Sequence, residues 1–154
     1  PLFYEPFMLY LSPKHILKDN DLVDASDLDL ANLWLLNEGH CFASQVINIC
    51  NQSEKMLTAR NFEYKSGSLE TLQRLVEQQD DNHTLLPQLA IQQMNENKKQ
   101  FIRNFTAPEP VREVSLVVHR SFLKKRLIEA LQKEILNVIP LSMQEKTGKN
   151  IIKI

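Results

Sequence analysis

Strand-like apolar runs alternate with amphipathic helical segments along most of this chain. The strand-like runs fall at residues 2–12, 32–37, 62–64, 84–86, 101–105 and 111–119, and the helical patterns at 24–30, 40–51, 69–76, 88–94 and 121–138. In an alternating chain, helices usually connect strands that run in the same direction and pack against the sheet. The pattern therefore predicts an α/β domain with a mostly parallel sheet flanked by helices, plus a returning strand and a long C-terminal helix.

Composition excludes several classes of protein. The 154 residues carry a net charge of −1, so bulk electrostatic binding of nucleic acid is not expected. No apolar run reaches the roughly 18 residues of a membrane helix, and the three glycines form no phosphate-binding loop. Two cysteines are too few for a disulfide scaffold, which favours a reducing compartment. The chain starts at Pro1 inside a strand-like run, which suggests a piece of a longer protein.

The cysteine pair carries the most informative chemistry. Cys41 follows Gly39-His40 at the expected start of the 40–51 helix, where unpaired N–H groups and the helix dipole favour a thiolate. Cys50 lies nine residues on, about 13.5 Å along a continuous helix, whereas a disulfide needs Cα atoms within about 7 Å. The two thiols could bond only if this helix unwinds, as a redox switch requires. The competing interpretation is that both cysteines are small buried apolar residues.

Other polar and aromatic residues have plainer interpretations. Asp80, Asp81 and His83 could ligate a metal, but a solvated polar turn fits better, since no second ligand pair stands at zinc spacing. Trp34 is expected in the core under the 40–51 helix. The apolar stripe of 123–138 is expected to be core, part of it possible subunit interface, and residues 144–154 are expected to form a tail.

Four stretches resemble the regulatory domain of the peroxide-sensing LysR-type transcriptional regulators. They are PLFYEPFMLYLSPKH, LLNEGHCFASQVINIC, SLETLQRLV and TLLP, and the resemblance weakens after about residue 139. It implies a periplasmic-binding-protein-like effector fold. In that fold, residues 1–110 would form the second regulatory subdomain, 111–140 a crossover strand and helix that pack on the absent first subdomain, and 141–154 a C-terminal tail.

The resemblance also implies residue roles. Cys41 matches the peroxide-reactive cysteine, Cys50 its disulfide partner, and His40 the histidine of the peroxide pocket. Two positions after the reactive cysteine, where some members carry Arg, this chain has Ala43. The usual Gly-rich turn before the L-L-P strand is replaced by residues 80–83, and the loop after Cys50 is longer than expected.

These observations predict a cytoplasmic redox sensor with no cofactor and no metal. Hydrogen peroxide would oxidise Cys41, and a reversible disulfide with Cys50 would remodel the 40–51 helix and a homodimer or tetramer interface. A thiol reductant would reset the pair. DNA would bind only through an N-terminal helix-turn-helix domain outside this chain, and no membrane contact is expected. Two alternatives remain open: an effector domain that binds a small metabolite and has structural cysteines, and a thiol peroxidase.

Overall fold

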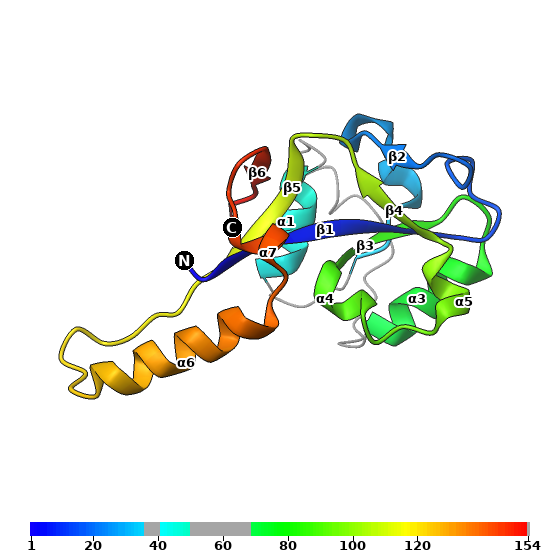
Figure 1. The fold of residues 1–154 in the computed structure, drawn as a ribbon. Coiled ribbons are helices and arrows are strands. Elements are labelled where there is room, and N and C mark those ends of the chain that lie inside the picture. Colours follow the sequence, from blue (N-terminus) through cyan, green and yellow to red (C-terminus); the bar gives the residue numbers. More distant parts are fainter. Residues whose placement is uncertain (36–40, 50–68, 154) are drawn as a thin grey trace.

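The computed structural model describes residues 1–35, 41–49 and 69–153 (Figure 1). The strands are β1 (Phe3–Leu11), β2 (Leu22–Val23), β3 (His83–Pro87), β4 (Ile102–Phe105), β5 (Glu109–Val114) and β6 (Lys149–Ile151). The helices are α1 (Cys41–Ile49), α3 (Leu69–Gln78), α4 (Gln88–Ile91), α5 (Glu96–Lys99), α6 (Lys125–Val138) and α7 (Leu141–Gln144), with short 3-10 turns at Ala25–Asp27 and Leu30–Asn32. The expected α/β class is confirmed. The run expected at 62–64 lies outside the described residues.

β1 is the central strand of the sheet. Its first half pairs with β5, and its second half lies between β3 and β4, all three antiparallel to it. Between the described strands, parallel pairing occurs at β2–β4 and β5–β6. The expectation of a mostly parallel sheet is therefore wrong. The prediction rested on helices that connect strands running in the same direction, whereas β1 pairs antiparallel with strands that begin at residue 83 and beyond.

The two faces of β1 bury separate apolar clusters, because side chains alternate along a strand. Phe7, Leu9 and Leu11 point to one face, where they join Val46 and Ile49 of α1. Tyr10 points to the other, against Val76 of α3 and Leu86 of β3. In Figure 1, α3, α4 and α5 gather below β1 and β3.

A buried ion pair joins β1 to β5. Glu5 is 1% exposed and sits directly opposite Arg112 in the strand register. Its Oε2 accepts from Arg112 Nε at 2.8 Å and Nη2 at 2.6 Å, while its Oε1 accepts from the backbone N–H of Leu89 at 2.8 Å. A buried carboxylate needs such partners, so this pair fixes the register of β1 against β5.

α6 stands away from the sheet (Figure 1). The sequence places the helix start at Ser121, but the helix begins at Lys125, and none of its residues is buried. Leu123, Leu127, Leu131 and Val138 are 93%, 59%, 45% and 79% exposed. Most of the stripe is thus exposed rather than core in this chain, contrary to expectation, although Ile135 is half-buried.

Tertiary contacts alter several of the local elements that the sequence predicts. The helical pattern expected at 24–30 forms a 3-10 turn at Ala25–Asp27, which Asp24 caps by accepting from Ser26 N–H. The run expected as a strand at 32–37 is described as far as residue 35, where a 3-10 turn ends at Asn32 and Leu33 forms a single bridge with His83. Its last two residues lie outside the described part of the chain. β5 begins at Glu109, two residues before the strand-like run expected at 111–119, and ends at Val114. None of the described helices has the length and apolar character needed to span a bilayer.

Candidate functional site

α1 is the element that carries the predicted reactive cysteine. The structure describes it from Cys41 to Ile49, which agrees with the predicted position of Cys41 near a helix N-terminus. Val46 and Ile49 are 0% and 5% exposed and anchor the helix in the core beside β1. This spacing of three places both side chains on one face of the helix, which explains why a short apolar helix is held here.

The other predicted site residues are less fully described. His40 and Cys50 lie outside the described residues, as does the loop that follows Cys50. For Cys41 and Ala43 the structure describes the backbone in α1. The juxtaposition of Cys41, Cys50 and His40 therefore stays a prediction.

The C-terminal segment, residues 149–153, holds α1 from the side. β6 adds to the free edge of β5, and Ile152 N–H donates to Val111 O at 2.9 Å. Ile152 is 8% exposed and joins the same core cluster as Val46. The α1 side chains Gln45 and Asn48 donate to the carbonyl oxygens of residues 152 and 153, at 3.4 Å and 3.1 Å.

Sequence reasoning missed these contacts, because residues 144–154 were expected to be a tail. A three-residue strand forms only where a neighbouring edge offers hydrogen bonds, and no local periodicity reports such an edge. The signal that the sequence offered was the apolar pair Ile151-Ile152 shortly after Gly148. In the structure Gly148 adopts a positive φ of 75° just before β6. α1, β5 and the C-terminal segment thus form one connected unit.

Trp34 does not lie beneath α1. It packs partly buried beside Tyr10, Val76 and Leu86, on the face of the sheet that α3 covers. The backbone N–H of Trp34 donates to the backbone carbonyl of His83 at 2.9 Å, and the backbone carbonyl of Trp34 accepts from Thr84 Oγ1 at 2.7 Å. The prediction failed because proximity in sequence to the cysteine was taken for proximity in space.

The turn at residues 80–83 is polar as predicted, but His83 is not solvated. It opens β3, is fully buried and lies 3.2 Å from the ring of His15. Asp81 takes a positive φ of 63°, the conformation that glycine would adopt freely, and so replaces a Gly-rich turn. Among the described residues, no three His, Cys, Asp or Glu side chains gather as a metal site.

A second network on the other face joins α3 to α5. Tyr10 Oη donates to Glu77, and Lys98 Nζ lies 2.7 Å from the same carboxylate oxygen. Burial, together with the hydrogen bond and charge of Glu77, raises the pKa of Tyr10 well above its ordinary value. Burial opposes ionisation of Glu77, but its partners Lys98 and Tyr10 outweigh that effect and hold its pKa below the usual range.

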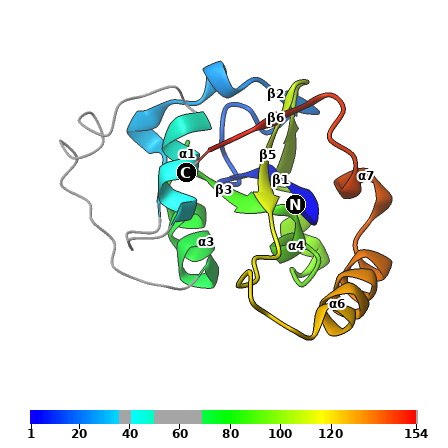
Figure 2. The same ribbon diagram turned by 90° about the vertical axis from the view of Figure 1, so that its left-hand side faces the viewer.

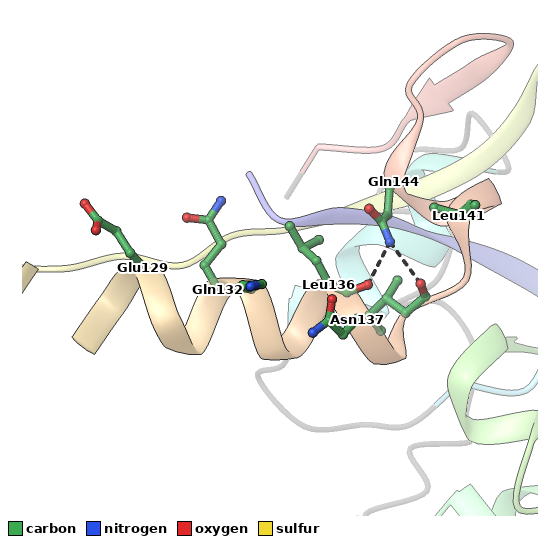
Figure 3. A pocket seen from close by; sticks show the side chains of 8 residues that line it. Glu129, Gln132, Leu136, Asn137, Leu141 and Gln144 are labelled. Atoms are coloured by element: carbon green, nitrogen blue, oxygen red, sulfur yellow. Dashed lines mark hydrogen bonds between the residues drawn. The ribbon is translucent and has the colours of Figure 1, made fainter. Parts of the chain in front are cut away.

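An open hollow of about 520 Å³ lies between α6 and α7 (Figure 3). Its lining includes Glu129, Gln132, Leu136 and Leu141. Gln144 crosses it and donates to the carbonyl oxygens of Leu136 and Ile139 at 2.9 Å and 3.0 Å, which caps the end of α6. No residue of α1 lines the hollow, and Figure 2 places α1 and α6 on opposite sides of the molecule. The hollow is therefore separate from the predicted thiol chemistry.

Comparison with known proteins identifies the family of this chain. The LysR substrate binding domain family matches residues 1–139. The chain is 28% identical over 150 residues to the hydrogen peroxide-inducible genes activator of Dickeya chrysanthemi, covering 97% of this chain and 48% of that protein. It is 30% identical over 117 residues to the DNA-binding transcriptional dual regulator OxyR of Escherichia coli, covering 76% and 37%.

Solved structures agree with the sequence matches. OxyR from Porphyromonas gingivalis aligns with a TM-score of 0.80 at 35% identity, covering 98% of this chain and 68% of that one. The reduced form of the same protein aligns with a TM-score of 0.79 at 34% identity, covering 97% and 67%. The chain spans less than half the length of the two curated relatives above. The matched residues and the shared fold together establish that this chain belongs to the LysR substrate-binding domain family, whose members are regulatory modules rather than a class of enzymes.

Proposed function

We propose that this chain is the redox-sensing part of a LysR-type transcription factor that responds to hydrogen peroxide, and that it senses peroxide rather than turning it over. One observation carries the proposal. Cys41 opens α1 in a chain whose curated relatives are named hydrogen peroxide-inducible gene activators. A helix N-terminus lowers the free energy of a thiolate, which is the form that reacts with peroxide.

The chemistry has two balanced steps. The Cys41 thiolate attacks one peroxide oxygen, an S–O bond forms, the O–O bond breaks, and hydroxide leaves with a proton as water. The Cys50 thiol then displaces the hydroxyl of the sulfenic acid, forming the S–S bond and a second water. His40, next to the reactive cysteine in sequence, would bind peroxide. A thiol reductant returns two electrons to reset the pair.

The length of α1 requires a structural change in the second step. An α-helix of nine residues separates its first and last Cα atoms by about 12 Å. Residue 50 is bonded to Ile49, and consecutive Cα atoms are about 3.8 Å apart. With α1 intact, the Cα atoms of Cys41 and Cys50 can approach no closer than about 8 Å, beyond the roughly 7 Å limit of a disulfide. Disulfide formation therefore needs α1 to open.

Opening α1 would disturb more than the helix itself. Val46 and Ile49 would leave the core, and the bonds from Gln45 and Asn48 to the C-terminal segment would break. Since that segment pairs with β5, the change would reach the edge of the sheet. We expect this altered surface to rearrange a homodimer or tetramer interface.

The exposed α6 supports the proposed division of the chain. Residues 1–110 would form the thiol-bearing subdomain, and α6 would pack on the rest of the regulatory domain, which this chain does not span. Residues 111–114, expected with α6, belong instead with the thiol-bearing part, because β5 pairs with β1. A stripe of exposed leucines on α6 fits such a contact, because large apolar patches on a monomer usually mark an interface. DNA binding in the cytoplasm would fall to a helix-turn-helix domain outside residues 1–154.

Mass spectrometry after one equivalent of peroxide tests the proposal. The purified chain should lose two hydrogens, and a digest should link the peptides that contain Cys41 and Cys50. In Cys50→Ser, a sulfenic acid trapped on Cys41 should accumulate, whereas Cys41→Ser should stay unmodified. Thiols that survive brief low-dose peroxide would refute the sensor.

The same samples separate the alternatives. A metabolite effector predicts a ligand-dependent rise in melting temperature that persists in Cys41→Ser. A thiol peroxidase predicts sustained peroxide consumption with a reductant, whereas a sensor consumes one equivalent and stops.

A further inference from the structure

Two imidazoles are buried against each other where the end of β1 meets the start of β3. His15 is 3% exposed and His83 is 0% exposed. Their rings meet edge to face with centroids 5.2 Å apart, and His15 Nε2 lies 3.2 Å from His83 Nδ1. The proposed thiol chemistry uses neither residue. Because an imidazole can carry one or two protons, the hydrogen bonds around the pair determine its charge.

Those hydrogen bonds assign a single protonation state. The backbone N–H of Leu17 donates to His15 Nδ1 at 3.0 Å, so this nitrogen accepts and carries no proton. The His15 proton is therefore on Nε2, from which it is donated to His83 Nδ1. His83 Nδ1 also lies 3.4 Å from the carbonyl oxygen of Asp81, but as the acceptor from His15 it leaves the His83 proton on Nε2. Both imidazoles are neutral in this arrangement.

An added proton disrupts the arrangement at either ring. On His15 it would go to Nδ1, where it would face the N–H of Leu17. On His83 it would go to Nδ1, which lies 3.2 Å from His15 Nε2 and 3.4 Å from the carbonyl oxygen of Asp81, so the new N–H would displace the hydrogen bond from His15. Protonation of His15 would thus oppose two donors at Leu17, and protonation of His83 would break the bond between the rings, both in a buried site where such a loss is unfavourable. Burial lowers the pKa of His15, an effect that the charge of Asp81 partly opposes.

The surrounding elements carry charges of both signs. The segment after β1 carries Lys14, Lys18, Asp19 and Asp21, the turn before β3 carries Asp80 and Asp81, and β4 carries Arg103. Lys14 and Asp80 pair with each other at 3.4 Å on the surface, and Arg103 donates to the carbonyl of Lys18. Of these, Asp81 acts on the pKa of His15.

Three segments of the chain meet at this pair. The turn after β1 is tied to the turn before β3 by Ser12 N–H, which donates to Asn82 O at 2.9 Å. The segment at 33–34 joins both through the bridge to His83 and through the hydrogen bond from Trp34. That segment leads along the chain toward α1.

We infer that the His15–His83 pair is a proton-sensitive lock, which holds these three segments together at neutral pH and loosens when the solution becomes acidic. A histidine whose folded pKa is lowered stabilises the fold above its unfolded pKa of about 6.5, and this stabilisation is lost as pH falls below that value. The test of this lock is independent of the proposed redox function, because unfolding of the reduced chain is measured without peroxide.

Urea denaturation of the reduced chain between pH 7.5 and pH 5.5 tests the lock. Each histidine that the fold keeps neutral should raise the unfolding equilibrium constant about tenfold over this range, so the pair should raise it between tenfold and hundredfold. The double variant His15→Gln/His83→Gln should lose this pH dependence. The exposed His119→Gln serves as the matched control and should keep it.

Nitrogen NMR of the unaltered chain gives a second test that requires no variant. Both imidazoles should appear as neutral rings protonated on Nε2, and they should remain so below pH 6.5 while the chain stays folded. The proposal is wrong if either ring of the pair is doubly protonated at pH 7, or if the double variant and the unaltered chain share one pH dependence.

Discussion

Truncation of Val46 should shift the redox equilibrium of the thiol pair. Val46 is 0% exposed in α1 and packs in the core beside β1. Val46→Ala removes two buried methylene equivalents, worth about 1.6 kcal/mol, and leaves a cavity, while alanine regains a few tenths as a better helix former. The net loss should be about 2 kcal/mol in the reduced chain. If the disulfide opens α1, the oxidised chain does not bear this loss.

That difference appears as a reduction potential. For a two-electron couple, about 1.4 kcal/mol corresponds to 30 mV, so the potential should become about 40 mV more negative. The sign is negative because reduction must rebuild a helix that is now less stable. The chain would be equilibrated with graded ratios of reduced and oxidised dithiothreitol, and the disulfide fraction would be read by mass spectrometry.

Val76→Ala provides the matched control. Val76 is also a valine in a helix, also 0% exposed, but it belongs to α3 on the opposite face of the sheet. It should lose comparable stability in urea yet keep its potential within about 10 mV, because α3 stays packed in both oxidation states. Equal potentials for the two variants, at equal loss of stability, would refute the claim that the disulfide unpacks α1.

Three further changes test the fold. Glu5→Gln should lower the free energy of unfolding by about 2 kcal/mol in urea, because it removes a buried carboxylate with charged and backbone partners, whereas the exposed Glu113→Gln should change it by less than about 0.5 kcal/mol. Stability should fall as pH rises above about 10, since the unfolded chain releases a phenolic proton that the folded chain keeps, and Tyr10→Phe should lessen this fall in pH-dependent urea titrations. Leu131→Glu should leave the melting temperature of this chain within about 2 °C but should disrupt assembly of a full-length protein on gel filtration.

Local patterns predicted much of the fold. Residues 3–11 are rich in Phe, Tyr, Leu and Met and form β1, and the stripe of Leu72 and Val76 marks α3. The short helical turn after Asp24 was also predictable from sequence, because its cap depends on residues two or three positions away. These features form from neighbours in sequence, so the sequence could report them.

Long-range pairing could not be read in this way. The direction of β1 relative to its partners, the strand β6 and the burial of His83 all depend on segments at least 40 residues apart. The site shows the same division. The helix that starts at Cys41 was predicted from its apolar face, whereas the hold of the C-terminal segment on Asn48 spans 105 residues.

The central position of β1 also determines when this fold can form during synthesis. The nearest partner of β1 in sequence is β3, whose His83 pairs with Leu11, and Glu5 must wait for Arg112, 107 residues later. At about 5–20 residues per second, the ribosome would leave this apolar strand without its final partner for roughly 5 to 20 seconds. Pro6, which lacks an N–H, lies within it and weakens its capacity to template pairing with other chains. Of the described strands, β1 is therefore the one that waits longest for its final partner and depends most on protection by the cell's chaperones.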